Sequence, residues 1–303
     1  MTMKSFKKVL FIGLLLIGLT VAVIYVFAQP ATALPVLSYY DYDKALPLQV
    51  KQSPWDTLAT HYQKKLVYTS VHNKQVTALL SVPKEGDGPQ KTIMLLHGLG
   101  DHKQVDYIEA AHNLFIDKGY AVFRIDIANH GDRFEQDLKF DLTGPHRYWT
   151  RNMVAQTVFD LRRGVDLLEQ HKEIDPNRIG FYGISLGGIT GTLFSGVEPR
   201  IKASVIVIAG GQLNLLYGED ALDSEAKEFV SVIEPLNFVE AISPRPLLML
   251  NAEEDEVILP MMSTLLYNKA KEPKKIIWYP AKHKTIPQPD VYLEGVNWYN
   301  THL

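Results

Sequence analysis

Residues 180–191 read GFYGISLGGITG and place Ser185 among glycines, directly after an apolar run that is typical of a buried strand. Residues 183–187 fit the pattern G-x-S-x-G between a predicted strand and a predicted helix. In a nucleophile elbow, such glycines let the strand and the helix approach each other, while the strained serine lifts its hydroxyl above the sheet. A tight strand-to-helix turn of any α/β protein is the alternative interpretation. Residues elsewhere in the chain are needed to decide between the two.

Strands alternate with helices through most of the chain. A polar turn at 72–74, flanked by two runs rich in β-branched residues, predicts a hairpin. The pattern that follows is typical of an α/β fold with a mostly parallel sheet of about eight strands and helices on both faces. Strands are predicted at 91–97, 120–126, 178–184, 202–210, 246–252 and 275–280, and helices at 105–118, 153–170, from 186, at 219–240, from 260 and at the C-terminus.

The N-terminal residues predict a membrane segment. Three lysines among residues 1–8 precede an uncharged run over 9–28, which is long enough to cross a bilayer, and the next basic residue is Lys44. We therefore expect the basic flank in the cytoplasm and the rest of the chain on the extracytoplasmic side, periplasmic or extracellular. Because the small residues at 31–33 are typical of a cleavage site, secretion after removal of a signal peptide is the alternative.

One catalytic domain is expected after this segment. Residues 29–60 predict a linker packed on the domain, residues 61–303 the domain itself, and residues 211–243 a short cap segment within it. The chain has 303 residues, of which 46% are hydrophobic, so it is long enough for one large core.

Composition and missing motifs exclude several kinds of site. The net charge of −3 gives no reason to expect nucleic acid as a partner, and the absence of cysteine excludes disulfides and a cysteine nucleophile. Neither the HExxH pattern of zinc proteases nor the phosphate-binding GxxxxGK pattern occurs. We therefore predict no metal and no cofactor. The sequence leaves the oligomeric state open.

An acidic residue is expected to orient the base that activates Ser185, because a serine is a weak nucleophile by itself. In this architecture the order along the chain is serine, acid and histidine, each after a strand. Asp255 lies in an acidic loop just beyond the strand predicted at 246–252. It is preferred for its place in the turn, and Glu254 is the alternative.

The base is expected to be His283, which follows the last predicted strand. The other histidine beyond the acidic loop, His302, lies beside the C-terminus, where the end of the chain is expected to fray. The three groups in this order predict a catalytic triad of Ser185, Asp255 and His283. The backbone N–H of Leu186, at a helix N-terminus, is expected to stabilise the oxyanion.

From residue 66 to its end, the chain resembles the α/β-hydrolase-fold serine hydrolases. The stretches 97–100 (HGLG), 126–133 (DIANHGDR) and 175–180 (DPNRIG) are similar to the dienelactone hydrolase and acetyl-esterase-like branch of that superfamily. The resemblance implies that the loop after His97 supplies the second oxyanion donor, the N–H of Leu99. It also implies that His97 is a structural residue.

Side chains after other strand ends are candidates for substrate binding. Arg133 follows a strand end, although a local ion pair with Asp126 is favoured for it. Residues 147–149 lie in a loop between two histidines and are candidates for lining the pocket. Residues 213–217 form either an apolar lip over the serine or an ordinary crossover helix. The substrate-binding candidates are Arg133, Tyr148, Trp149, Leu216 and Tyr217.

These features predict a membrane-anchored serine esterase that cleaves small-molecule carboxylic esters through an acyl-enzyme on Ser185. The short cap predicts an open pocket suited to small or flexible acyl groups. Because the histidine has to be neutral to act as a base, activity is expected to fall on acidification. The alternatives are an acyl-peptide or thioester hydrolase of the same fold, and a non-catalytic, membrane-tethered binding module.

Overall fold

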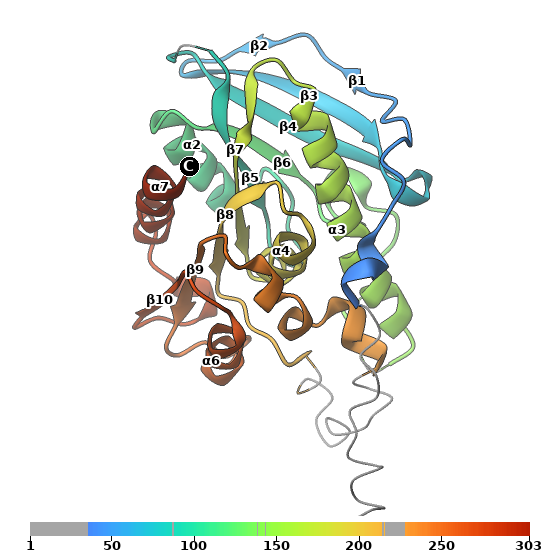
Figure 1. The fold of residues 1–303 in the computed structure, drawn as a ribbon, viewed down its shortest axis with the longest axis vertical. Helices are drawn as coiled ribbons and strands as arrows, with labels where there is room; N and C mark the ends of the chain where they lie inside the picture. The colour runs from blue at the N-terminus through green and yellow to red at the C-terminus, as the bar shows by residue number, and fades with distance from the viewer. Residues whose placement is uncertain (1–35, 87, 138, 143, 214, 216–227) are drawn as a thin grey trace, which may run out of the picture. The chain divides into compact units, whose positions relative to one another are not determined.

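A ten-stranded sheet forms the centre of the chain (Figure 1). The structure is a computed structural model, and it describes residues 36–86, 88–137, 139–142, 144–213, 215 and 228–303. Residues 37–303 form one compact unit. In the described ranges no helix combines the length and the hydrophobicity that a membrane span needs. The segment predicted to span the membrane, 9–28, lies outside them.

The sheet is mixed, with a parallel part that carries the carboxyl ends relevant to function. Its strands are β1 Lys51–Gln52, β2 Asp56–Thr57, β3 His61–Thr69, β4 Gln75–Pro83, β5 Gln90–Leu96, β6 Ala121–Ile125, β7 Ile174–Ile184, β8 Ile201–Val207, β9 Leu247–Ala252 and β10 Lys274–Tyr279. The order is β1-β3-β4-β6-β5-β7-β8-β9-β10, and β2 pairs with β3. Strands β5 to β10 pair in parallel, whereas all pairs that involve β1 to β4 are antiparallel.

The expected sheet of about eight strands is therefore corrected to ten. The hairpin predicted around residues 72–74 is confirmed as β3 and β4. The two further strands, β1 and β2, come from the segment interpreted as a linker, and both pair with β3. Each has two residues, which is too short for the alternation of apolar and polar residues that predicts a strand from sequence.

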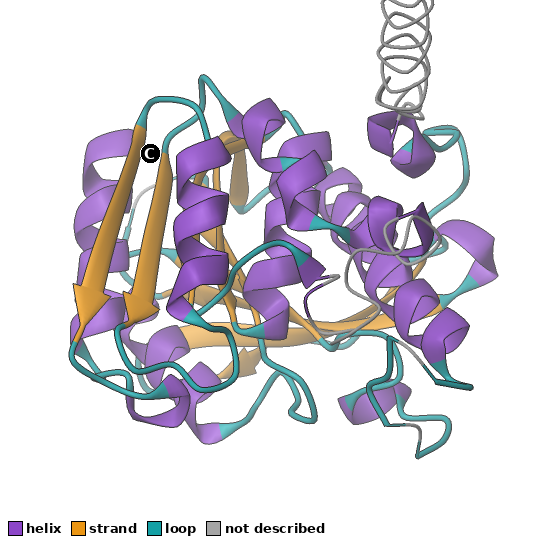
Figure 2. Cartoon of the chain, turned by 90° about the horizontal axis from the view of Figure 1, so that it is seen from below, coloured by secondary structure: helices purple, strands orange, loops and turns teal. Residues whose placement is uncertain are grey.

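Helices cover both faces of the sheet (Figures 1 and 2). Helix α2 contacts α7 on one face, and α3 contacts α4 on the other. Helix α3 begins well before residue 153, where the sequence predicted its start. Of the residues in its first turn only Thr150 is buried, so the apolar stripe from which the helix was predicted begins only further along. The bounds are α2 Asp106–Asp117, α3 Arg147–Glu169, α4 Leu186–Val197, α6 Pro260–Lys269 and α7 Asp290–His302.

The segment predicted as a helix over 219–240 lies partly outside the described residues. Its described part begins with the α-helical residues 228–230 and continues in three short 3-10 helices, Ser231–Ile233, Pro235–Asn237 and Val239–Ile242. Proline at the start of the second turn has no N–H to donate to a preceding helix, so it separates the turns. The helical character predicted for this part is therefore confirmed, but as short separate turns and not as one continuous helix.

A cluster of aromatic side chains fixes strand β7, which leads to Ser185. Tyr299 of α7 donates a hydrogen bond from its hydroxyl to the carbonyl of Phe181, at 2.6 Å. A Cβ at Gly180 would lie 2.8 Å from the Tyr299 ring, so only glycine lets the helix approach the strand this closely. Tyr182 packs on Phe115 of α2 with 5.4 Å between ring centroids. Both helices on this face therefore hold the strand that ends at the serine.

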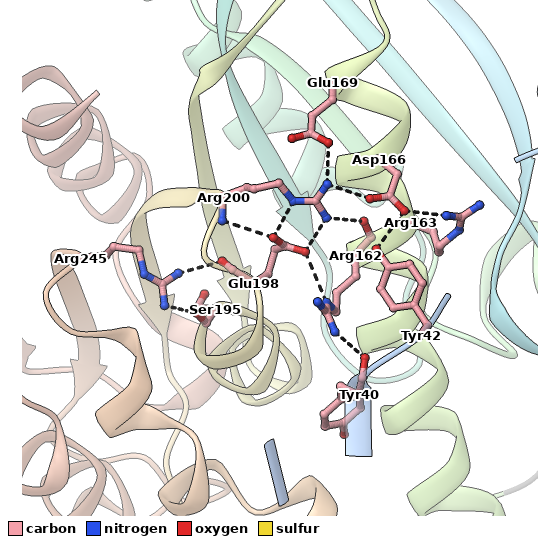
Figure 3. A network of polar contacts seen from close by, with 10 residues as sticks. All are labelled: Tyr40, Tyr42, Arg162, Arg163, Asp166, Glu169, Ser195, Glu198, Arg200 and Arg245. Carbon is pink, nitrogen blue, oxygen red and sulfur yellow. Dashed lines mark hydrogen bonds and ion pairs between the residues drawn. The ribbon is translucent and has the colours of Figure 1, made fainter. Parts of the chain in front are cut away.

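On the opposite face, a network of buried charges ties α3 and the end of α4 to the segment 40–46 (Figure 3). Glu198 accepts two hydrogen bonds of 2.7 Å from the Arg200 guanidinium and one of 3.3 Å from Arg162. Arg162 also donates to the carbonyl of Tyr40, and the Tyr42 hydroxyl donates to the carboxylate of Asp166. The Glu198 side chain is 1% exposed, so this carboxylate is the shielded centre of the network.

We expect Glu198→Ala to lower the free energy of unfolding by about 3 kcal/mol, because it leaves buried guanidinium groups without their shared counter-ion. Glu169→Ala is the matched control, since Glu169 also binds Arg200 at 2.6 Å but is 40% exposed. A loss below about 1 kcal/mol is expected for the control. Urea unfolding of both variants measures the difference. Equal losses would contradict a central role for Glu198.

Candidate active site

Ser185 lies between β7 and α4 in a strained backbone conformation, with φ 55° and ψ −118°. Its amide donates to the carbonyl of Val207, at 2.9 Å. A Cβ at Gly183 would lie 2.3 Å from the carbonyl oxygen of Gly187, and one at Gly187 would lie 2.5 Å from that of His97. Both glycines of the G-x-S-x-G pattern are therefore required by close backbone contacts, and the turn has the geometry of a nucleophile elbow.

The structure brings Ser185, His283 and Asp255 together, although they follow three different strands. The Ser185 hydroxyl oxygen lies 2.9 Å from Nε2 of His283. Nδ1 of the same ring lies 2.8 Å and 2.9 Å from the two carboxylate oxygens of Asp255. A proton on Nδ1 that is donated to the carboxylate leaves Nε2 as an acceptor for the serine hydroxyl. This is the arrangement in which a histidine can take a proton from a serine.

The Asp255 carboxylate is buried and held in place by the turn that follows it. The amides of Val257 and Ile258 donate to its Oδ1, at 2.9 Å and 2.8 Å. Glu254, the alternative acid, is exposed. His302, the other histidine considered, packs edge-on against Trp298 in α7, with ring centroids 4.4 Å apart. Of the two acids considered in the acidic loop, Asp255 is the one that contacts His283.

Two backbone amides beside Ser185 are available to an oxyanion. Leu99 and Leu186 both line the cavity at the serine. Within the part of the chain that the structure describes, neither amide donates a hydrogen bond to another residue. Leu186 is the first residue of α4, so the positive end of the helix dipole faces the same point.

Two buried histidines fix the loop that carries Leu99. Nδ1 of His97 lies 2.7 Å from the carbonyl of Gly98, and its Nε2 accepts the amide of Ile127, at 3.0 Å. His130 accepts the Gly100 amide at Nε2, at 3.0 Å, and its Nδ1 lies 3.0 Å from the carbonyl of Ala128. A ring that donates at one nitrogen and accepts at the other has to be neutral. Both rings are therefore neutral, and their hydrogen bonds hold the loop in place.

Sequence reasoning missed how residues outside the loop hold it. His130 is the first of the two histidines around the loop that was predicted to line the pocket, yet its buried ring binds Gly100. The hydroxyl of Tyr107 accepts the Gly98 amide at 2.7 Å and donates to Asp101 at 2.9 Å. The position of His130 inside the 126–133 stretch was an available signal. Tyr107 had none, because it lies in an ordinary helical pattern.

Burial lowers the pKa of His97 to about 4, from an ordinary value of 6.5. In the unfolded chain the ring takes up a proton as the pH falls below 6.5, whereas in the fold it stays neutral until about pH 4. Stability is therefore lost as the pH falls through this window. Between pH 7 and pH 5 we expect wild type to lose about 1–2 kcal/mol more unfolding free energy than His97→Gln.

Urea unfolding at both pH values measures this difference. His102→Gln is the control, because the His102 ring lies in the same loop but is exposed. It is expected to keep the wild-type loss. Equal losses in wild type and His97→Gln would show that His97 does not supply this pH dependence.

The ion pair expected between Asp126 and Arg133 is not the one that forms. Asp126 is fully buried and pairs with Lys103, whose Nζ lies 2.5 Å from the carboxylate. Arg133 pairs with Asp160 of α3, at 2.7 Å, and donates only to the backbone carbonyl of Asp126. The prediction was wrong because the actual partners, Lys103 and Asp160, lie in other segments of the chain. The sequence around residues 126–133 does not show that the fold brings them close.

The substrate-binding candidates that lie within the described residues do not line the cavity at the serine. Leu216 and Tyr217 lie outside the described ranges. Arg133, Tyr148 and Trp149 are not among the residues that line the cavity at Ser185. The Tyr148 ring instead packs edge-on against Phe229, with centroids 5.1 Å apart.

Among the described residues, no group of three or more metal-binding side chains is placed to hold an ion.

A cavity of about 670 Å³ opens beside Ser185 and His283. Most of the lining is aliphatic or aromatic. Its members include Leu99, Val105, Phe140, Val154, Ile184, Leu186, Ile189, Val207, Ile208, Leu213, Ile233, Val257, Ile258, Ile286 and Val291.

The chain is similar to known hydrolases and esterases. The family model of acetyl xylan esterase (AXE1) matches residues 34–209. The putative hydrolase YtaP of Bacillus subtilis is 28% identical over 214 residues, which are 61% of this chain and 67% of YtaP. The esterase YjfP of Escherichia coli is 23% identical over 235 residues, 72% of this chain and 91% of YjfP.

A solved structure shows the same fold. The acetyl xylan esterase from Paenibacillus sp. R4 superposes with a TM-score of 0.74 at 18% identity, over 91% of this chain and 97% of that one. The resemblance to α/β-hydrolases and to their acetyl-esterase-like branch is thereby confirmed. The family match covers more than half of the chain, so this chain belongs to the acetyl xylan esterase family and is a carboxylic ester hydrolase.

Proposed function

We propose that the protein hydrolyses carboxylic esters with Ser185 as nucleophile, His283 as general base and Asp255 as the group that orients the histidine. The contact that carries the proposal is the one between the Ser185 hydroxyl and Nε2 of His283, 2.9 Å long. The oxyanion donors are the backbone amides of Leu99 and Leu186.

The reaction has two halves. His283 takes the proton of Ser185 as the serine oxygen attacks the ester carbonyl, and the carbonyl oxygen becomes an oxyanion between the two amides. The imidazolium then gives its proton to the leaving alcohol, so that the C–O bond breaks and an acyl-enzyme remains. Water attacks the acyl-enzyme in the same way, with His283 as base, and returns the acid and the free serine. The Asp255 carboxylate stabilises the imidazolium in both halves.

Labelling with a fluorescent fluorophosphonate tests the proposal, because this probe forms a stable bond only with an activated serine. We expect the purified full chain to label strongly and to release p-nitrophenol from p-nitrophenyl esters. Peptide mapping should place the label on Ser185. A folded protein that neither labels nor turns over these esters would contradict the proposal.

We also propose that the catalytic unit lies on the extracytoplasmic side of a membrane, tethered by residues 9–28. The proposal rests on the uncharged run and the lysines that precede it. The mass of the mature protein distinguishes a retained anchor from a cleaved signal peptide. A mature chain found in the cytoplasm would contradict both the retained anchor and the cleaved signal peptide.

A further inference from the structure

The cavity beside Ser185 has an apolar interior and a mouth with both polar and apolar side chains, the exposed Leu99 and Val257 among them. Lys284 and Gln288 line it and are exposed to solvent, and Asp101 is half-buried. The lining residues Val154, Ile189, Leu213 and Ile233 are buried, with at most 5% of each exposed. An ester placed with its carbonyl at Ser185 therefore has one side on which polar groups find partners and another on which they do not.

The apolar interior is poorly suited to a sugar. Each buried hydroxyl of a carbohydrate needs a hydrogen-bond partner, and losing it costs about 1–3 kcal/mol. Side chains such as Val154, Ile189 and Ile233 offer none. A hydrocarbon chain gains from the same surface, at about 0.8 kcal/mol for each CH₂ group that it buries. The interior therefore favours the acyl part of the ester.

The cavity is also too large for an acetyl group alone. At about 30 Å³ for each group of the size of a water molecule, the CH₃, C and O of an acetyl group fill roughly 90 Å³. This is less than a sixth of the 670 Å³ that the cavity offers. On the same measure an acyl group of about eight carbons with its carbonyl oxygen fills about 270 Å³ and leaves room for the alcohol near the mouth.

We propose that this cavity binds an unbranched acyl chain of about six to ten carbons, with the polar alcohol at its mouth. The acyl chain lies along Val154 of α3, Ile189 of α4 and Ile233. The proposal rests on the proposed function, because it assigns the substrate class of the same site. It departs from the acetyl group that names the family.

The first test is the rate of hydrolysis of p-nitrophenyl esters from acetate to decanoate by the wild-type full chain. We expect kcat/KM to rise about fourfold for each CH₂ group that enters the cavity, and octanoate to exceed acetate at least about 100-fold. Fluorophosphonate labelling is run on the same protein. It reports the activated serine without depending on the acyl chain.

A pair of variants tests whether this particular wall holds the chain. Val154→Thr keeps the shape of the side chain and puts a hydroxyl on the wall. Val158→Thr makes the same change one turn further along α3, at a residue that is fully buried but does not line the cavity. In a helix, either hydroxyl can bond to a carbonyl one turn back. We expect Val154→Thr to lower kcat/KM for octanoate about fourfold and for acetate less than twofold. Val158→Thr should leave the ratio of the two unchanged.

Failure of the inference differs from failure of the proposed function. Strong labelling together with a preference for acetate would overturn the acyl-chain proposal and leave the serine hydrolase intact. An unchanged octanoate-to-acetate ratio in Val154→Thr would also overturn the assignment of this wall. A folded protein that neither labels nor turns over any of the esters would overturn both.

Discussion

Ser185→Ala is expected to lower kcat for ester hydrolysis by at least about 10⁴-fold and to abolish fluorophosphonate labelling. The Ser185 hydroxyl is the only nucleophilic group that the described residues place against Nε2 of His283. The variant keeps a Cβ at the strained position with φ 55°, so the fold is expected to keep its stability. Single-turnover kinetics with p-nitrophenyl acetate measures the loss of activity, and urea unfolding measures the stability of the variant.

Ser231→Ala provides the comparison, because Ser231 lies two residues before Ile233, which lines the cavity, but donates its hydroxyl to the carbonyl of Glu228. It is expected to label and react like wild type. If Ser185→Ala retained more than about a hundredth of the activity, Ser185 would not be the nucleophile.

Asp255→Asn is expected to lower kcat about 10³- to 10⁴-fold with little change in KM. Two amides, those of Val257 and Ile258, donate to Oδ1 and will hold the oxygen of the new side chain in that place. The NH₂ group then replaces Oδ2, the nearer of the two oxygens to Nδ1 of His283, at 2.8 Å against 2.9 Å for Oδ1. An NH₂ group donates to Nδ1, so the ring proton moves to Nε2, which can no longer accept the serine proton.

Glu254→Gln makes the equivalent change at the neighbouring exposed carboxylate and should leave kcat unchanged. Histidine NMR adds a direct reading, since the imidazole proton should be found on Nδ1 in wild type and on Nε2 in Asp255→Asn. Wild-type kcat in Asp255→Asn would show that the carboxylate does not set the protonation of His283.

The sequence by itself determined the parts of this protein that depend on neighbours along the chain. The elbow around Ser185 can be recognised locally, because its G-x-S-x-G pattern stands between a strand and a helix and Gly183 is needed for the close contact with Gly187, although Gly187 is needed for a contact with the carbonyl of His97 after β5. The alternation of strands and helices is local as well, and it implies a parallel sheet whose carboxyl ends meet at one edge. Asp255 and His283 could be named because each follows a strand of that sheet.

Tertiary structure alone decided the features that join distant segments. Strands β1 and β2 are too short to have a pattern, and they exist only because β3 offers a free edge. Lys103 and Asp160 became the partners of Asp126 and Arg133 because the fold brings loops and α3 together around those charges. The apolar cavity has the same origin, since its walls come from helices, strand ends and loops. The apolar pattern of each segment predicts a contribution to the core, but it does not predict that these side chains surround a cavity.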